Sequence, residues 1–275
     1  MGSGREAVPP FLRWPGGKRW LTPTMQKVIG GGQYSRYFEP FLGGGAMFFA
    51  LQIKPAILSD VNGDLIDTYK AVRGSSQEVV RRLRRLRVDV QAFRSISTSR
   101  PKDVVGRAVR LLYLNRVAFS GIYRVNRFGQ FNVPFGGDRK LDALWRDGRL
   151  SIAATALKGQ VTLTCSDFEE SISEAGRGDL VYCDPTYNVT HAENGFRRYN
   201  EKYFTWADQE RLARVAQAAA ARGATVVLSN AHFLPLRDLY PGAKIRVVER
   251  VSTVARDPKA RAPVKEYLFV LRNGE

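Results

Sequence analysis

The stretch RYFEPFLGGGAMFFALQI, residues 36–53, decides the expected fold. A short apolar run, a turn of three glycines and a longer apolar run predict a strand, a tight turn and a helix. Residues 55–74 repeat the pattern, with a strand at AILSD and a helix for which Asn62 or Asp64 is the candidate N-cap. Strands that alternate with helices predict a mostly parallel sheet covered by helices on both faces.

The second half of the chain continues this alternation. The expected elements are two strands within 159–172 and 178–187, a helix from Thr205 or Asp208 to Gly223, a strand at 225–230, and two antiparallel strands within 244–254 and 264–273. The predicted fold class is therefore α/β, with a Rossmann-like, mostly parallel sheet that closes in a C-terminal antiparallel hairpin.

The middle of the chain breaks the alternation. Its expected elements are an arginine-rich helix within 75–93, a helix within 103–119, and a hairpin within 120–137 that turns around Arg127, Phe128 and Gly129. We expect residues 1–69 and 158–275 to form one α/β domain, and residues 70–157 to be a mainly helical domain inserted into it.

The charge of the chain is concentrated in this insertion. The protein has 43 Lys and Arg against 26 Asp and Glu, a net charge of +17. Residues 70–150 hold 19 of the basic and 6 of the acidic residues, a net charge of +13. Such localisation favours a binding surface for a polyanion, most commonly nucleic acid, over a generally basic surface.

Composition and targeting signals narrow the class of protein. Hydrophobic residues make up 44% of the 275, which predicts a packed interior, and no apolar run approaches the ~20 residues that span a bilayer. The first residues lack the apolar block of a signal peptide. Cys165 and Cys183 lie in expected strands, where they predict reduced core thiols of a cytoplasmic protein. His191 and His232 are far apart, so no metal site is expected.

Polar residues and glycines follow several expected strands, at the sheet edge where ligands of parallel sheets bind. The glycines from Gly43 to Gly45 let the backbone turn tightly and approach a nucleoside-containing ligand. Asp60 can accept hydrogen bonds from ribose hydroxyls, although a helix-capping aspartate explains it equally well. Asp167 and Phe168 suit an adenine ring; taken alone, they fit a turn acid beside a core phenylalanine better.

The stretch VYCDPTYNVT, residues 181–190, holds the candidate catalytic residues. Asp184 and the carbonyl oxygen of Pro185 offer two acceptors at a strand end, and Tyr187 offers a flat face for stacking. This set suits the exocyclic amino group of a flipped-out base. Accepting the hydrogens of that amine returns its lone pair from the ring to the nitrogen, which can then attack an electrophile. Asp-Pro alone would be an ordinary turn.

In this order the segments resemble the Dam-type DNA adenine-N6 methyltransferases, the D12 class or alpha group. The segments that carry the resemblance are FLRWPGGKRWL (11–21), YFEPFLGGGAMFFAL (37–51), SDVNGDLIDTY (59–69), LNRVAFSGIYRVNRFGQFNVPFG (114–136), DPTY (184–187), FTWADQERLA (204–213), VVLSNAH (226–232) and RVSTVARDPKARAPVKEYLF (250–269). The likeness covers nearly the whole chain, and the family's catalytic tetrapeptide DPPY corresponds to DPTY.

The resemblance implies S-adenosyl-L-methionine as cofactor and roles for individual residues. Lys18 would pair with the methionine carboxylate, Asp60 would accept from the ribose, and Asp167 with Phe168 would hold the cofactor adenine. The full set of cofactor residues implied by the resemblance is Trp14, Lys18, Glu39, Phe41, Gly43, Gly45, Asp60, Asp167, Phe168 and Asp184. Asp184 and Pro185 would hold the target amino group, with Tyr187 stacked on the base.

The insertion would be the target-recognition domain for double-stranded DNA. The candidate contacts to phosphates or bases are Arg116, Arg124, Asn126, Arg127 and Asn132. A second group, Arg81, Arg82, Arg84, Arg85 and Arg87, is too densely spaced to share one helix face. For it we expect a solvated helix with about two phosphate contacts.

Two departures from the family pattern and two alternatives remain open. Thr186 replaces the second proline of the tetrapeptide, and GDRKLDALW (137–145) lacks the aromatic and basic residues of a GATC-specific member. The alternatives are a related amino-methyltransferase that acts on RNA, and an inactive, methylase-derived DNA-binding protein. Cytosine-C5 chemistry is unsupported because no Pro-Cys loop is present.

The resemblance also predicts the setting of the protein. We expect a monomer in the cytoplasm of a prokaryote, or one encoded by a phage, with no membrane association. A cognate restriction endonuclease is a candidate partner.

Overall fold

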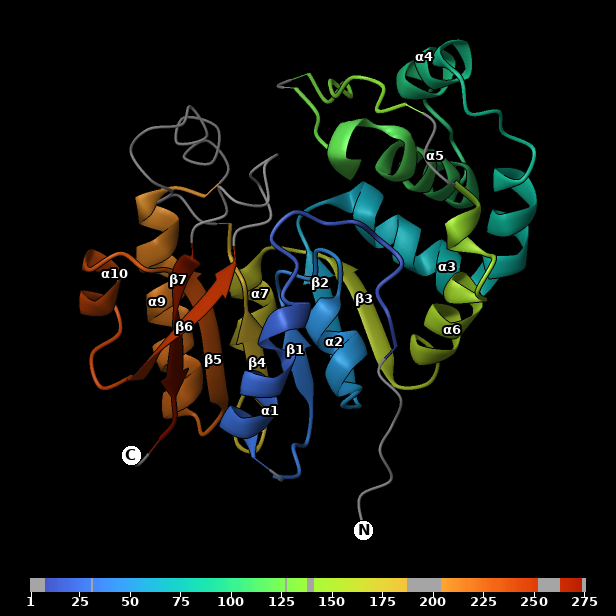
Figure 1. The fold of residues 1–275 in the computed structure, drawn as a ribbon. Coiled ribbons are helices and arrows are strands. Elements are labelled where there is room, and N and C mark those ends of the chain that lie inside the picture. The colour runs from blue at the N-terminus through green and yellow to red at the C-terminus, as the bar shows by residue number, and fades with distance from the viewer. Residues whose placement is uncertain are drawn as a thin grey trace. The chain divides into compact units, whose positions relative to one another are not determined.

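The computed structural model describes residues 8–30, 32–126, 128–137, 141–186, 204–251 and 263–273 (Figure 1). The strands are β1 (Tyr37–Glu39), β2 (Ala56–Asp60), β3 (Val161–Cys165), β4 (Leu180–Cys183), β5 (Thr225–Ala231), β6 (Lys244–Val251) and β7 (Pro263–Leu271). The α-helices are α1 (Thr22–Ile29), α2 (Ala46–Leu51), α3 (Gly63–Leu83), α4 (Val90–Thr98), α5 (Val104–Val117), α6 (Arg149–Ala156), α7 (Phe168–Ser173), α9 (Trp206–Ala221) and α10 (Pro235–Asp238). Short 3-10 helices are η1 (Arg19–Leu21), η2 (Phe119–Gly121) and η3 (Leu141–Leu144).

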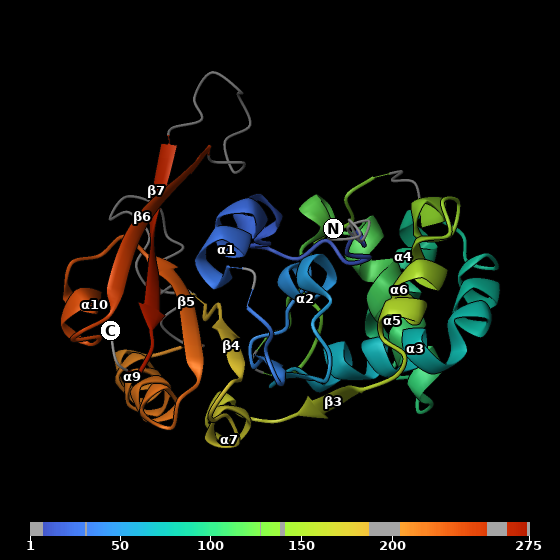
Figure 2. The ribbon, with the colours of Figure 1, turned by 90° about the horizontal axis from the view of Figure 1, so that it is seen from below.

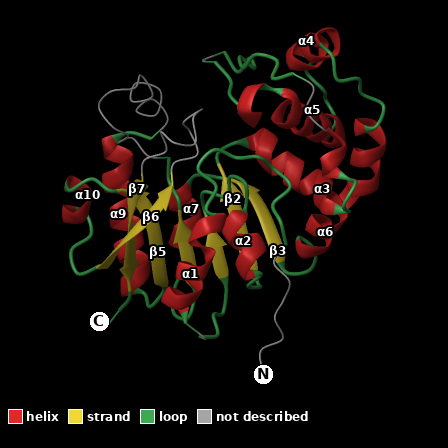
Figure 3. Cartoon of the chain, in the orientation of Figure 1, coloured by secondary structure: helices red, strands yellow, loops and turns green. Residues whose placement is uncertain are grey.

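The strands form a seven-stranded sheet in the order β3-β2-β1-β4-β5-β7-β6 (Figure 3). The pairs β1–β2, β1–β4 and β4–β5 are parallel, whereas β7 is antiparallel to both β5 and β6. The α/β class, the Rossmann-like order and the closing antiparallel hairpin are therefore confirmed. None of the helices in the described ranges has the length and apolar character that a membrane crossing requires.

The chain divides into two compact units that interleave in sequence. The first unit comprises residues 1–22, 42–52 and 60–165, and the second comprises 23–41, 53–59 and 166–275. The predicted insertion, 70–157, falls wholly within the first unit. Its boundaries as a separate domain remain a prediction.

In the second unit, helices cover both faces of the strands. Figure 2 shows most of α1 on one face of β4 and β5, with α7 and α9 on the other. The buried alanines of α9, among them Ala213 and Ala216, pack in one apolar cluster with Val226 and Leu228 of β5. Small side chains let the helix approach the sheet closely, and the branched side chains of the strand fill the space between them.

Capping residues fix where the helices of the second unit begin and end. Thr205 and Asp208 form a capping box at the start of α9, so both candidate residues for this helix start take part in it. After α9, Gly223 has φ +95°, and a Cβ there would lie 3.1 Å from Cα of Arg177. Only glycine fits this position, so the predicted stop at Gly223 has a steric cause.

In the first unit, α3 packs against α5 and α6. Asn62 caps α3 by accepting from the backbone N–H of Leu65, which confirms the first of the two predicted caps. The helix bends at Ser75, whose φ and ψ are −145° and 34°. The prediction of one helix within 75–93 is wrong, because α3 ends at Leu83 and α4 starts after Asp89.

Local hydrogen bonds explain the other boundaries of the first unit. Asp89 accepts from the N–H of Ala92 and Asp103 from that of Gly106, so each opens a new helix. The predicted hairpin is present: Asn126 N–H donates to the carbonyl of Gln130, and Val125 forms an antiparallel bridge with Phe131. Arg127 lies outside the described residues.

The two cysteines differ in environment. Cys183 is buried, as predicted, and burial raises the pKa of its thiol. Cys165 is exposed, so the prediction of a core thiol is wrong for this residue. It is the last residue of β3, and its side chain is accessible to solvent there.

Candidate functional site

The glycine loop of the first unit is built against Trp14. A Cβ on Gly43 would lie 2.9 Å from Cδ1 of the indole, and one on Gly44 would lie 2.9 Å from Cβ of the same tryptophan. Gly45 has φ +64°, and a Cβ there would meet the Tyr69 hydroxyl at 2.8 Å. The loop therefore needs glycines for two reasons, its left-handed backbone and the side chains beneath it.

Asp60 holds this loop at the end of β2. One carboxylate oxygen accepts from the N–H of Gly43 at 3.0 Å, and the other accepts from the N–H of Asn62 at 3.0 Å. Burial raises the pKa of Asp60 above 3.8, and these two hydrogen bonds oppose the rise. Each carboxylate oxygen can accept a further hydrogen bond, so the same group can also take donors from a ligand.

Two further polar side chains anchor the N-terminal segment of this unit. Lys18 is 4% exposed, and its ammonium group donates to the carbonyl of Gly16 at 3.0 Å. Asn115 of α5 is fully buried and clasps the backbone of Arg13: its Oδ1 accepts from the N–H at 2.9 Å, and its Nδ2 donates to the carbonyl at 2.6 Å. The same Nδ2 donates to the carbonyl of Gly121 at 3.0 Å. Trp14, which supports the glycine loop, directly follows the clasped residue.

In the second unit, Asp184 ends a chain of hydroxyl groups. Ser229 of β5 donates to Oδ1 of Asp184 at 2.8 Å, and the Tyr182 hydroxyl lies 3.0 Å from the serine oxygen. Since the serine hydrogen is directed to the carboxylate, the tyrosine donates to the serine. Burial and the charge of Asp184 raise the pKa of Tyr182 well above 10.0, so the tyrosine stays protonated and keeps this donor role.

The tetrapeptide DPTY, residues 184–187, which is predicted to be catalytic, is described in part. Pro185 is buried and Thr186 is exposed. Tyr187, the predicted stacking residue, lies outside the described residues.

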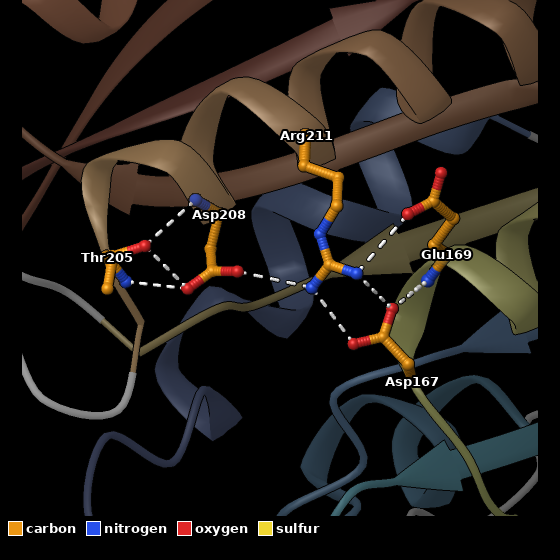
Figure 4. A network of polar contacts seen from close by, with 5 residues as sticks. All are labelled: Asp167, Glu169, Thr205, Asp208 and Arg211. Carbon is orange, nitrogen blue, oxygen red and sulfur yellow. Dashed lines mark hydrogen bonds and ion pairs between the residues drawn. The ribbon is translucent and has the colours of Figure 1, made fainter.

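Asp167 is tied into a network between α7 and α9 (Figure 4). It is the N-cap of α7 through the N–H of Glu169, and its two oxygens accept from Nη1 and Nη2 of Arg211 at 2.9 and 3.0 Å. Arg211 also contacts Glu169 and Asp208. The alternative of a turn acid beside a core phenylalanine is thus realised, with the acid as a helix cap, and the bidentate pair fixes the start of α7 to α9.

Phe168, Phe41 and Glu39 of the second unit are held by buried contacts. Phe168 is 3% exposed; its ring stacks on that of Phe41 at 5.3 Å, and the Arg211 guanidinium lies 4.3 Å from its centroid. Glu39 is 3% exposed and accepts from the Tyr37 hydroxyl at 2.8 Å. Burial, and then the charge of Glu39, raise the pKa of Tyr37.

The predicted DNA contacts occupy two kinds of position. Arg124 and Asn132 face each other across the hairpin, with Nε of the arginine donating to the asparagine Oδ1 at 2.8 Å. Asn126 forms the turn, because its Oδ1 accepts from the N–H groups of Phe128 and Gln130. All three are partly or fully accessible.

Arg116 differs from the other candidates, since only 3% of it is exposed. It donates to the carbonyl of Phe11 at 3.0 Å, and burial together with the charges of Arg13 and Arg149 lowers its pKa to about 10. A side chain this deeply buried supports the N-terminal segment from within. Its role as a DNA contact remains a prediction, and it would require the guanidinium to reach past its present packing.

The structure brings the predicted residues together in two groups, one in each unit. Trp14, Gly43, Gly45 and Asp60 form one assembly in the first unit. In the second, Phe41 contacts Phe168, and Asp167 is its neighbour in the chain.

Sequence reasoning missed Ser229, Tyr182, Asn115 and Tyr69, whose hydroxyl donates to the carbonyl of Gly43 at 3.0 Å. For Asn115 the signal was present, as an amide directly after the apolar run LLYL, residues 111–114. Ser229 could only be linked to Asp184 through the register of β4 and β5, in which Cys183 pairs with Leu228.

Comparison with known proteins matches the chain to DNA methyltransferases, both by a family model and by individual relatives. A family model described as "D12 class N6 adenine-specific DNA methyltransferase" matches residues 14–254. The chain is 31% identical to the type II methyltransferase M1.LlaDCHI of Lactococcus lactis subsp. cremoris over 267 residues, which cover 94% of both chains. It is 31% identical to the DNA adenine methylase of Escherichia coli K12 over 271 residues, covering 96% of this chain and 95% of that protein. It is also 32% identical to the type II methyltransferase M.MjaIII of Methanocaldococcus jannaschii over 290 residues, covering 96% and 99%.

Proposed function

Because this chain belongs to the D12 class of N6 adenine-specific DNA methyltransferases, we propose that it methylates adenine N6 at a specific duplex sequence with Asp184, Pro185 and Tyr187 as its catalytic residues. Membership of the family makes the protein an S-adenosylmethionine-dependent enzyme whose substrate is DNA. The proposal adds extrusion of the target base from the duplex and direct attack by its amino group.

The observation that carries the proposal is the chain from Tyr182 through Ser229 to Asp184. The serine hydroxyl at the end of this chain orients the Asp184 carboxylate by donating to its Oδ1. The carboxylate has further lone pairs that can accept from an amino group. With the Pro185 carbonyl as second acceptor for the N6 hydrogens, the lone pair of N6 is returned from the adenine ring to the nitrogen and can attack the methyl group. Tyr187 then holds the ring by stacking, and Thr186 supplies no atom that this scheme requires.

The residues of the first unit fit the adenosyl and methionine parts of the cofactor. The glycine loop carries no side chains, so a ligand can approach its backbone closely, and Asp60 offers acceptors for ribose hydroxyls. Lys18 is a buried cation suited to a carboxylate. The bound cofactor supplies an electrophilic methyl group on a sulfonium.

Asp167 and Phe168 are proposed to hold the cofactor adenine, with Glu39 and Phe41 beside them. Since the Phe168 side chain is buried by Phe41 and Arg211, we assign it a supporting role beneath the adenine.

Residues 70–157 are proposed to recognise the target sequence. Arg124, Asn126, Arg127 and Asn132 of the hairpin would contact bases or phosphates, with Arg116 behind them. The pairing of Arg124 with Asn132 presents a guanidinium in a fixed direction, which a fork to guanine O6 and N7 needs.

The setting of the protein follows from its relatives, which are methylases of bacteria, archaea and a phage. We propose a cytoplasmic monomer. Similarity to type II methyltransferases is compatible with a cognate restriction endonuclease as partner.

One experiment tests the proposed function. Purified protein is incubated with S-adenosylmethionine and a plasmid library, and modified bases are located by direct sequencing. We expect N6-methyladenine within a short consensus. Methylation of a matched RNA pool alone would support the RNA alternative, and no modification of either would support the inactive, DNA-binding alternative.

A further inference from the structure

A basic pocket lies between α3 and α6 of the first unit, and no part of the proposed catalytic scheme uses it. Its volume is about 510 Å³, and its lining includes Arg81, Arg84, Arg85, Trp145, Gly148 and Ser151. None of the lining residues, all of which are described, is acidic. The arginines come from the segment for which sequence alone predicted a solvated helix with about two phosphate contacts, at positions it did not specify.

The three arginines differ in how far their charge is balanced. Arg81 pairs with Glu78 at 2.6 Å, and Glu78 also takes Arg82 at 2.7 Å. Hydrogen bonds from Arg81 and Arg82 lower the pKa of Glu78 to about 2, so this acid stays ionised and offsets their charge. Arg84 instead lies over the ring of Trp145, 5.8 Å from its centroid. The positive charge that Glu78 does not offset therefore comes from Arg84 and Arg85.

The remaining wall of the pocket adds to this positive potential. Gly148 is the N-cap of α6 and has no side chain to accept from the first N–H groups of the helix. Ser151 lies in the same first turn and also lines the pocket. A helix N-terminus next to two arginines and a tryptophan matches a phosphate with its attached sugar, because the arginines pair with the oxygens and the ring covers the apolar side.

We propose that this pocket binds the phosphate backbone of duplex DNA outside the methylated sequence. The inference rests on the proposed function for its ligand, since duplex DNA is the polyanion that the enzyme meets. Figure 1 shows α6 and the end of α3 apart from the hairpin that follows α5. A contact at the pocket therefore lengthens the stretch of DNA held by the enzyme and contributes affinity without sequence information.

The test measures equilibrium binding, so it does not depend on methylation. The full-length protein and its double variant Arg84→Gln/Arg85→Gln are titrated with random-sequence duplexes of about 12 and about 40 base pairs over a range of salt concentrations. On the long duplex we expect the slope of log affinity against log salt to become shallower by about 2 in the variant, because two phosphates are no longer neutralised. On the short duplex the slope changes by less.

The matched control is Arg87→Gln/Arg94→Gln, which removes the same charge from exposed positions that do not line the pocket. Circular dichroism confirms that both variants are folded. An equal reduction of affinity in the two double variants, or an equal change on both duplex lengths, would show that general charge and not the pocket is responsible. Either result would overturn the proposal. Failure of methylation in the wild-type protein would leave this comparison unaffected.

Discussion

Ser229 and Asp184 are neighbours only because β4 and β5 pair in a particular register. The sequence predicted the carboxylate at a strand end, since an acid that follows an apolar strand is visible in one segment. It could not predict the partner, because registers between strands distant in sequence are set by packing on both faces of the sheet.

A first prediction concerns these two residues. Asp184→Ala should reduce methyl transfer by at least about a hundredfold while DNA affinity stays unchanged, because it removes an acceptor aligned with the reacting amine. Ser229→Ala should cost roughly tenfold or more, since it removes one hydrogen bond to a charged group. Single-turnover methylation and equilibrium DNA binding check both.

The control is Asp238→Ala, which removes an exposed carboxylate of the same unit. If Asp184→Ala retained wild-type transfer, the assignment of this acid to catalysis would be wrong. If Ser229→Ala alone had no effect, the hydroxyl chain would be a packing feature.

A second prediction concerns Asp60 and pH. Because burial raises the pKa of Asp60 in the folded protein, protonation of this group favours folding: the contribution is full below the ordinary value of 3.8 and is lost as pH rises through the raised pKa. The ribose contact, by contrast, needs the ionised form. Cofactor affinity should therefore fall on acidification at a higher pH than an exposed aspartate would give.

Titration calorimetry with S-adenosylmethionine from neutral pH down to about 4 measures this dependence. Asp60→Asn should bind more weakly and lose the acid limb of the curve. An unchanged acid limb in that variant would assign the titration to another group.

Residue burial also marks the limit of sequence reasoning for Arg116 and Phe168. Arginine in a basic insertion predicts surface, whereas the sequence around Phe168 taken alone favoured a core phenylalanine and only the resemblance gave its ring a ligand contact. Both are buried, because α5 and α7 turn these positions inward. A single sequence shows the residue type but not which face of a helix meets the rest of the protein.

Among the elements, α5 connects two functions within the first unit. Asn115 near its C-terminal end clasps the segment that leads to Trp14, and the residues that follow α5 lead into the hairpin. Ala118, just after the helix, forms an antiparallel bridge with Phe135, near the residue where the hairpin ends. The helix therefore holds the support of the glycine loop and the base of the hairpin together.

A third prediction follows from this arrangement. Asn115→Ala leaves buried backbone groups of Arg13 without partners and should lower the free energy of unfolding by about 1–3 kcal/mol. S-adenosylmethionine affinity should fall as well, because Trp14 loses its fixed position under the glycine loop. Thermal melting and calorimetry of the folded variant at low temperature separate the two effects.

Asn273→Ala serves as the control, since that asparagine makes one exposed hydrogen bond, to the carbonyl of Ala221. A variant at Asn115 that is destabilised but binds the cofactor normally would limit the role of this residue to folding.

Helix boundaries were predicted well where the capping residue lies outside a charged segment. They were predicted poorly where it lies within one. Asn62, Thr205 and Gly223 were recognised from their types and positions. Asp89 was missed because it lies inside an arginine-rich run with continuous helical periodicity. Its hydrogen bond to Ala92 nonetheless starts a new helix, since a cap satisfies N–H groups that no preceding turn serves.

At the scale of the whole molecule, charge and fold class were the most predictable features. Both depend on sums over many residues, so a single misplaced boundary changes them little. The two interleaved units were not foreseen, because contacts between distant segments define them.

A fourth prediction belongs to the whole molecule. Log affinity for duplex DNA should fall linearly with log salt, with a slope of about −0.9 for each phosphate neutralised. With several contacts along the insertion, a few-fold rise in salt should weaken binding by orders of magnitude. Fluorescence anisotropy with a labelled duplex measures the slope, and a flat dependence would exclude the basic insertion as the DNA surface.

The bend of α3 at Ser75 has a consequence for how this family member can change in length. The helix starts beside Asp60, which holds the glycine loop, and ends beside the arginines of the basic pocket. Each residue of an α-helix turns its successor by about 100°. One residue inserted or deleted before the bend would rotate those arginines out of phase with the loop, so this stretch should tolerate substitutions far more readily than changes in length.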